Sequence, residues 1–145
     1  MDAEAYLKLG DIFLNQSDYV NARKYYEKAT EGEANGEALW RLGNFYLLGN
    51  GVEQDYGKAK EYYEKSAQED YPKAFAKIGY LYAKGKGVEV DFGKAIEFLE
   101  KGISKGDAES MHNLGELYFC GTGVEKDVDK ALELFKAAAK KNFPR

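Results

Sequence analysis

Apolar residues return along this chain with the spacing of a helix face. Leu39, Leu42, Phe45 and Tyr46 stand at positions i, i+3, i+6 and i+7. A second run keeps the spacing i, i+3, i+4, i+7 and i+8, and it comprises Ala59, Tyr62, Tyr63, Ser66 and Ala67. Apolar and polar residues do not alternate one by one, as they would in a half-buried strand. The pattern therefore predicts a pair of helices and no strand in this stretch of the chain.

A glycine in the first of these helices recurs at a fixed distance. Gly43, Gly79 and Gly115 each follow Leu or Ile and precede Tyr by three positions, and both spacings are 36 residues (79 − 43 and 115 − 79). An earlier copy of the phrase contains Gly10, 33 residues before Gly43 (43 − 10). A period of this length is typical of stacked supersecondary units. The four predicted copies span residues 3–35, 36–71, 72–107 and 108–143.

Each of the later copies joins its two helices by a Gly-x-Gly-Val segment. Gly49 and Gly51 belong to this segment in the second copy, and paired glycines end a helix by adopting positive φ. Aspartates suited to the N-cap of the next helix follow, and they are Asp55, Asp91 and Asp127. In the first copy, Ser17 or Asp18 is expected to be the N-cap of the second helix. Gly43 costs about 1 kcal/mol in a helix interior, so we expect a close helix approach there.

The whole pattern resembles the Sel1-like repeat. The second copy matches the family phrase A-x-x-x-L-G-x-x-Y…G-x-G-V-x-x-D-x-x-K-A throughout, from Ala38 to Ala59. The first copy lacks the Gly-x-Gly-Val segment and is more similar to the shorter tetratricopeptide repeat. The resemblance covers essentially the whole chain. It implies an all-α fold, a right-handed α-solenoid of four antiparallel helix pairs, whose first helices line a concave groove.

The resemblance also implies a class of function. Proteins similar to this one are adaptors, or scaffolds, that bind a partner protein or peptide in the groove, and we expect the same of this chain. One alternative is an immunity-type protein that neutralises a toxin by tight binding. Another, of a different class, is a small-molecule-binding or hydrolytic repeat protein. A single nanomolar partner would favour the first alternative, and turnover lost in a groove mutant would favour the second.

Groove positions follow if the tetratricopeptide arrangement carries over. Positions 5, 9 and 12 of the first helices then supply the predicted groove residues, which are Leu7, Asp11, Leu14, Trp40, Asn44, Leu47, Tyr80, His112, Glu116 and Phe119. Position 13 adds Asn15, Leu48, Lys84 and Cys120. We expect Trp40, Tyr80 and Phe119 to anchor the partner, because such rings often dominate binding energy. The acidic groove residues favour a partner with basic side chains. The other interpretation is that these rings pack between neighbouring helices.

The single histidine and the single cysteine argue against catalysis. His112 and Cys120 fall in one predicted helix, eight residues and therefore about 12 Å apart. They are too far apart to act as nucleophile and base, and one His with one Cys does not make a zinc site. We therefore expect no enzyme activity, no cofactor and no metal site.

Length and composition narrow the remaining classes. A chain of 145 residues has the length of one domain, so we expect residues 1–145 to form a single repeat domain. The net charge of −4, from 21 basic and 25 acidic residues, argues against nucleic acid as partner. No signal peptide and no apolar run of about 18 residues is visible. The expectation is a cytoplasmic protein that does not insert into membranes.

The last residues resemble the start of a further copy. Phe143-Pro144-Arg145 is similar to Tyr71-Pro72-Lys73, which leads into a new first helix. No additional helix follows to cover the last one, as solenoids usually need. We therefore expect Leu132, Leu134 and Phe135 to be partly uncovered. Three explanations stay open: a piece of a longer array, self-association through this helix, or an end that tolerates exposure.

Overall fold

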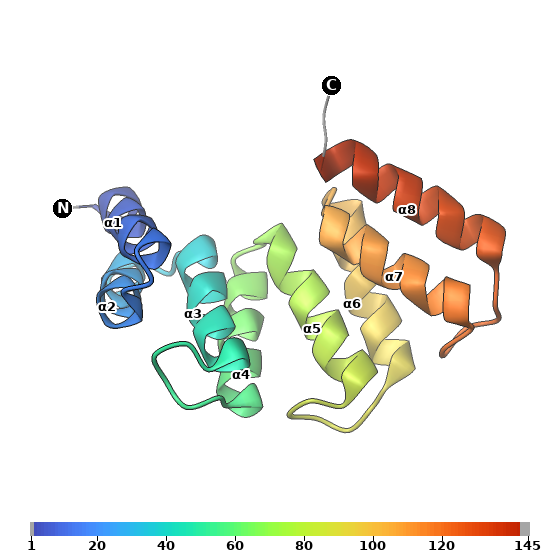
Figure 1. The fold of residues 1–145 in the computed structure, drawn as a ribbon, viewed down its shortest axis with the longest axis horizontal. Helices are drawn as coiled ribbons and strands as arrows, with labels where there is room; N and C mark the ends of the chain where they lie inside the picture. Colours follow the sequence, from blue (N-terminus) through green and yellow to red (C-terminus); the bar gives the residue numbers. More distant parts are fainter. Residues whose placement is uncertain (1, 143–145) are drawn as a thin grey trace. The chain divides into compact units, whose positions relative to one another are not determined.

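Eight helices make up the part of the chain that the computed structural model describes, residues 2–142, and no strand occurs in it. The helices are α1 (Ala3–Asn15), α2 (Tyr19–Ala29), α3 (Gly36–Leu48), α4 (Tyr56–Gln68), α5 (Pro72–Lys84), α6 (Phe92–Ser104), α7 (Ala108–Cys120) and α8 (Val128–Asn142). Figure 1 shows them as successive pairs, each joined by a loop. The predicted all-α class is confirmed. Residues 143–145, in which the sequence indicates the start of a further copy, lie outside the described residues.

Helix starts follow the predicted capping. The side chain of Asp55 accepts a 3.0 Å hydrogen bond from the backbone N–H of Lys58, and Asp91 and Asp127 cap α6 and α8 in the same way. In the first copy the cap is Asp18, which accepts a 3.2 Å bond from the N–H of Asn21. Helix α3 ends at Gly49, where φ is +71° and the N–H bonds to the Phe45 carbonyl. Each carboxylate thus satisfies a backbone donor that the helix leaves unpaired.

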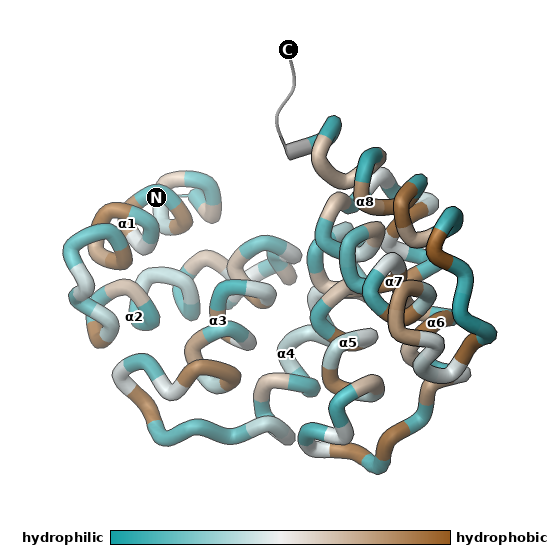
Figure 2. The backbone as a smooth tube through the Cα atoms, turned by 45° about the vertical axis from the view of Figure 1, so that its right-hand side comes forward, coloured by the Kyte–Doolittle hydropathy of each residue, from teal (hydrophilic) through white to brown (hydrophobic). Residues whose placement is uncertain are grey.

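Two compact units divide the chain, Met1–Tyr71 (unit 1) and Pro72–Arg145 (unit 2). Unit 1 contains α1–α4 and unit 2 contains α5–α8. In each unit, the helices of a pair pack against each other, and the second helix of one pair packs against the first helix of the next. Figure 2 shows apolar and polar segments alternating along each helix, as the 3.6-residue period requires. The apolar stripes therefore meet inside each unit.

The repeat glycine of each pair lies directly against a side chain of the second helix. A Cβ added at Gly43 would lie 2.6 Å from a ring carbon of Tyr63, and one added at Gly10 would lie 2.6 Å from the ring of Tyr26. In unit 2, the Leu99 side chain occupies the equivalent place against Gly79. The predicted close approach at Gly43 is confirmed, because only a glycine leaves room for these side chains.

Unit 1 has a continuous core built around this contact. Its buried members are Leu7, Ala22, Tyr26, Ala29, Ala38, Leu42 and Phe45. Between the two pairs of unit 2, Gly102 of α6 lies against Ser110 of α7. The aligned residues of unit 1 are Ala29 and Ala38. The Ser110 hydroxyl donates a 2.7 Å bond to Asp107, the N-cap of α7, so this buried polar group is satisfied.

Candidate functional site: a hollow between α5, α6 and α7

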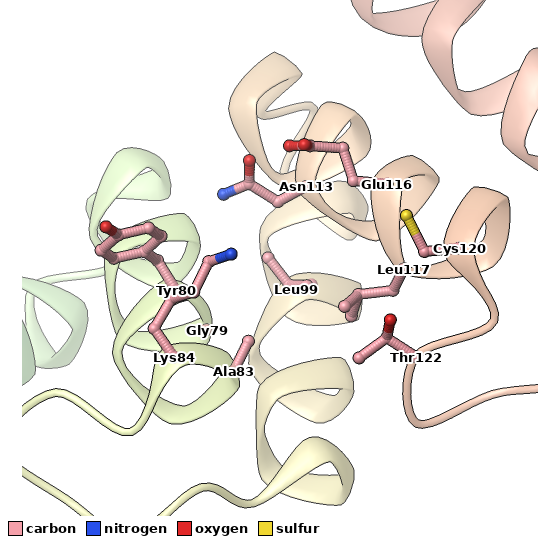
Figure 3. A pocket seen from close by; sticks show the side chains of 10 residues that line it. All are labelled: Gly79, Tyr80, Ala83, Lys84, Leu99, Asn113, Glu116, Leu117, Cys120 and Thr122. Carbon is pink, nitrogen blue, oxygen red and sulfur yellow. The ribbon is translucent and has the colours of Figure 1, made fainter.

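Unit 2 contains a hollow of about 440 Å³ between three of its helices. It is lined by Gly79, Tyr80, Ala83, Lys84, Leu99, Asn113, Glu116, Leu117, Cys120 and Thr122. Its apolar lining comes from Ala83, Leu99 and Leu117, whereas the charged groups belong to Lys84 and Glu116. Figure 3 shows that α5 and α7 form facing walls and that Leu99 of α6 lies between them.

Helical spacing places the polar groups on these walls. Tyr80 and Lys84 are one turn apart on α5, and Asn113, Glu116 and Cys120 follow at i, i+3 and i+7 on α7. Residues of one such series project from the same face of a helix. In Figure 3 the Lys84 amine and the Asn113 amide extend into the space between α5 and α7. A ligand in the hollow would therefore meet hydrogen-bonding groups from both sides.

The ring of Tyr80 is held in place on one wall. The Lys86 ammonium donates a 3.1 Å hydrogen bond to the Tyr80 hydroxyl and lies 5.3 Å from the ring centroid. Lys84, one turn after Tyr80, forms no ion pair within residues 2–142 and is exposed. An exposed ammonium without an internal counter-ion can donate to a carboxylate or carbonyl of a ligand.

On the other wall, Glu116 carries the negative charge. Its carboxylate lies 3.2 Å from Nε2 of His112, and the pair is ionic when the imidazole is protonated. His112 does not line the hollow, since its ring packs against Phe135 of α8 with 5.4 Å between centroids. Phe119 does not line it either, although this side chain is 53% exposed. Of the predicted groove residues in unit 2, Tyr80 and Glu116 therefore line the hollow from different helices, and His112 and Phe119 do not line it.

At the equivalent positions of unit 1 stand Asp11 and Asn44, and tyrosine hydroxyls hydrogen-bond to both of them. The Tyr26 hydroxyl donates a 2.6 Å bond to Asp11, which also lies 3.6 Å from Nε of Arg41. The Tyr63 hydroxyl donates a 2.5 Å bond to Asn44. Burial raises the pKa of Tyr26 well above its usual value, and the bond to the Asp11 carboxylate raises it further. In unit 2, Leu99 and Phe135 replace these tyrosines and offer no hydroxyl.

Two predicted groove residues of unit 1 are buried, so the expectation that they are exposed is wrong. Trp40 is 8% exposed and Leu7 is 5% exposed. The Trp40 ring packs against Tyr71, with 5.7 Å between centroids, and the Arg41 guanidinium lies 5.0 Å from its ring centroid. Leu7 belongs to the core of unit 1. Leu14 and Leu47 are half-buried.

Sequence reasoning missed some of the lining residues. Lys84 and Cys120 occupy predicted groove positions, but Asn113, Leu117 and Thr122 do not. Asn113 directly precedes the Leu-Gly phrase of the fourth copy. Its polar character at a position next to a core residue was the available signal.

A second hollow, of about 550 Å³, lies in unit 1 on the side of α2 and α4. Glu27, Glu31 and Glu69 contribute to its lining, together with Lys65 and Tyr62. Burial raises the pKa of the Tyr62 hydroxyl. The charged residues are all exposed, as expected of a solvated rim. Lys84 and Glu116 of the unit 2 hollow are exposed as well, so exposure does not distinguish the two. We favour the hollow of unit 2 because it contains the predicted groove residues Tyr80 and Glu116, whereas the hollow of unit 1 contains none.

Within residues 2–142, no three His, Cys, Asp or Glu side chains are grouped so that they could hold a metal ion. None of the helices in this range has the length and the apolar character that a membrane span needs.

Comparison with protein families agrees with the helix pairs. The family model for the Sel1 repeat matches residues 36–71, 72–107 and 108–143, and a tetratricopeptide repeat model matches residues 3–31. The chain belongs to the Sel1 repeat family. Repeats of the Sel1 and tetratricopeptide type generally mediate protein–protein interaction, and they are typically non-enzymatic scaffolds. No curated protein matched this Sel1 repeat chain in the sequence comparison.

Solved structures of other Sel1 repeat proteins share the fold. A Sel1 repeat protein from Oxalobacter formigenes is 29% identical, with a TM-score of 0.81 over 98% of this chain and 59% of that chain. The protein c5321 of Escherichia coli, described as a protective antigen of uropathogenic strains, is 30% identical, with a TM-score of 0.81 over 98% of this chain and 31% of that one. This Sel1 repeat chain therefore spans less than two thirds of either relative, and the likeness supports the solenoid class of fold.

Proposed function

We propose that this Sel1 repeat chain is an adaptor that binds an extended peptide segment of a partner protein in the hollow of unit 2. The observation that supports the proposal is the combination of an apolar floor with polar groups on two facing helices. Unit 1 lacks this combination at the equivalent positions, because the hydroxyls of Tyr26 and Tyr63 already hydrogen-bond to Asp11 and Asn44.

The dimensions suit part of a peptide. A hollow of about 440 Å³ is within the range of about 300–1,000 Å³ that ligand sites occupy. The floor of Ala83, Leu99 and Leu117 would bury an apolar side chain of the peptide. Lys84 would donate to a carbonyl or carboxylate of the peptide, and Glu116 would accept from a backbone N–H or a basic side chain.

The proposal is a binding function because the chemistry around Cys120 is incomplete for catalysis. The sole imidazole, that of His112, lies beside Glu116 and packs against Phe135. A cysteine nucleophile needs a base within hydrogen-bond reach. Cys120 is exposed and lines the hollow, so it is better understood as part of a contact surface.

Selection from a random peptide library, followed by titration of the selected peptide, tests the proposal. Ala83→Gln places a polar side chain on the floor, and we expect it to weaken binding by about tenfold or more, or about 1.4 kcal/mol. Lys84→Ala should weaken binding less. Ala137→Gln, the same change at an exposed position of α8, is the matched control and should leave affinity unchanged.

Backbone chemical shifts supply the second readout. A bound peptide should perturb the amides of α5 and α7 around Tyr80 and Glu116. Equal affinity of the parent and Ala83→Gln, or perturbations confined to unit 1, would contradict the proposal. Binding of small molecules but of no peptide would instead favour a small-molecule site.

A further inference from the structure

Helix α8 presents an exposed apolar stripe along its length. Val128 and Leu132 are each 49% exposed, Phe135 is half-buried and Ala139 is exposed. Their spacing of i, i+4, i+7 and i+11 keeps them on one face of the helix. Figure 2 shows brown apolar segments recurring along α8 between polar ones. This set of four residues is called the α8 stripe below.

The same face is covered one copy earlier. Val128, Leu132 and Ala139 correspond to Phe92, Ile96 and Ile103 of α6, which are all partly buried. Helix α7 packs against α6, and Gly123 in the loop that follows α7 contacts the Phe92 side chain. Val128, Leu132 and Ala139 thus occupy positions that take part in the contact between consecutive pairs one copy earlier, and within residues 2–142 they are exposed. Phe135 borders this face, because its ring also lies against Gly115 inside its own pair, as Leu99 lies against Gly79.

The exposed apolar surface extends onto α7. The His112 ring packs against Phe135 of the stripe. Phe119 is seven residues after His112, which places both on one face of α7, and its side chain is 53% exposed. Phe119 thus adds an exposed ring to the face of α7 that carries His112, and exposed apolar surface of this kind marks interaction sites.

A line of charges runs beside the α8 stripe, displaced from it by one residue. It consists of Asp129, Glu133, Lys136 and Lys140, which are all exposed. The acidic residues stand in the first half of the helix and the basic residues in the second half. A second α8 helix lying antiparallel would place its basic half against the acidic half of the first, so the charges would be complementary along the whole contact.

The residues of α8 are spaced symmetrically about its middle, so two antiparallel copies of the helix place matching residues opposite each other. Val128 and Ala139 are equally far from a point between residues 133 and 134, and so are Leu132 and Phe135. The charged residues are symmetric about the next residue boundary, between 134 and 135. This symmetry pairs Asp129 with Lys140 and Glu133 with Lys136. The two centres differ by one residue, about 1.5 Å along the helix, which side chains can span. An antiparallel pairing therefore matches apolar with apolar residues and acid with base.

We propose that the α8 stripe is the contact surface of a two-fold symmetric dimer, in which α8 pairs antiparallel with α8 of a second copy of this chain. In an isologous contact, if residue i of one copy meets residue j of the other, then residue j of the first copy meets residue i of the second. Leu132 then packs on Phe135 of the partner copy, and Glu133 pairs with Lys136 across the interface. Phe119 of α7 lies at the edge of the contact. None of the four stripe residues lines the hollow.

Sedimentation velocity over about 5–500 µM tests for the dimer, because association makes the average mass depend on concentration. The parent chain should shift from monomer toward dimer. Leu132→Glu, at the centre of the stripe, should raise the dissociation constant by about thirtyfold or more, equivalent to about 2 kcal/mol. Ala137→Glu introduces the same charge on the same helix away from the stripe, and it should leave the constant within about threefold of the parent.

A charge exchange tests the antiparallel register. Glu133→Lys and Lys136→Glu should each weaken the dimer by about threefold to tenfold, since each places like charges opposite one another. The double variant carrying both changes should restore the parent dissociation constant. Circular dichroism of each variant checks that the helices are retained, so that a loss of fold is not mistaken for a loss of contact.

Each other outcome contradicts the dimer. A parent chain that stays monomeric over the whole range overturns it. A dimer that is insensitive to Leu132→Glu places the contact elsewhere. A dimer that Leu132→Glu disrupts but the double exchange does not restore excludes the antiparallel register. A mass that grows beyond the dimer indicates head-to-tail association instead.

Discussion

The Tyr26 hydroxyl donates a 2.6 Å hydrogen bond to the Asp11 carboxylate, across the gap that Gly10 leaves between α1 and α2. In the second copy, the Tyr63 hydroxyl donates to Asn44 across Gly43. These bonds hold the residue after the repeat glycine inside its own helix pair. In the third copy Leu99 occupies the tyrosine position, and Tyr80, which follows Gly79, lines the hollow.

The first prediction concerns alkaline pH. Burial, and then the bond to Asp11, raise the pKa of Tyr26 in the folded state above its ordinary value of 10.0. A group whose pKa is raised on folding contributes stability below its unfolded pKa and loses that contribution as pH rises above it. The contribution of Tyr26 is therefore complete at pH 7 and declines above about pH 10.

Urea unfolding of the parent and of Tyr26→Phe at several pH values measures this decline. At pH 7, Tyr26→Phe should lower the unfolding free energy by about 1–2 kcal/mol, because a hydrogen bond to a charged group is lost. Above about pH 10 the difference between the two proteins should shrink. Asn21→Ala, at an α2 residue outside this bond, provides a comparison. A difference that stays constant with pH would contradict the assignment.

The second prediction concerns the close approach at the repeat glycine. Gly43→Ala introduces a Cβ 2.6 Å from the Tyr63 ring, which is fully buried and has little room to move. We expect a loss of about 2–3 kcal/mol, typical of overpacking, measured by chemical denaturation. Gly32→Ala is the matched control, since an added Cβ there has no neighbour within 4 Å. Equal stability of the two variants would show that the glycine is not required.

The third prediction uses a size exchange between the units. Gly102 and Ser110 in unit 2 correspond to Ala29 and Ala38 in unit 1, and all four are buried. Gly102→Ala alone should cost about 2–3 kcal/mol, because its Cβ would collide with the Ser110 side chain. Ser110→Ala alone should cost about 1 kcal/mol through the lost bond to Asp107.

The double variant Gly102→Ala/Ser110→Ala recreates the alanine pair of unit 1. Its loss should be smaller than the sum of the two single losses by about 1 kcal/mol or more, because residues in contact are coupled. A double-mutant cycle of unfolding free energies measures the coupling. Additive losses would mean that the collision with Ser110 does not determine the cost at Gly102.

The fourth prediction links the tyrosine position to peptide binding. Leu99→Tyr with Tyr80→Asn transfers the Tyr63–Asn44 pair of the second copy into the third. The new ring would lie on Gly79 as Tyr63 lies on Gly43 and would fill the hollow. We expect peptide affinity to fall by about tenfold or more, with the unfolding free energy within about 1 kcal/mol of the parent. Unchanged affinity would place the binding site outside the hollow.

The fold was predictable from the sequence because its determinants are local or periodic. The glycine at each 36-residue step predicts the close helix approach, and Asp55 predicts the start of α4 from its own position. Both hold because backbone geometry and capping depend on few neighbours.

The candidate site was only partly predictable, because exposure depends on residues distant in sequence. Asp11 occupies a groove position, but whether its carboxylate is accessible depends on Tyr26 and Arg41. Trp40 packs against Tyr71, which a rule based on position within one helix does not include. Tyr80 lines the hollow in the copy where Leu99 stands in place of the tyrosine. The residue of the second helix that faces the repeat glycine, a tyrosine in the first two copies and Leu99 in the third, distinguishes the filled helix pairs from the one beside the hollow.

The exchange of tyrosine for leucine opposite the repeat glycine has a consequence for how such proteins diversify. One substitution at this position, with a second after the glycine, converts a filled helix pair into one with a vacancy, while the backbone scaffold stays the same. Arrays could therefore gain, lose or relocate recognition sites by point mutation in individual copies, without any change in the number or length of the copies.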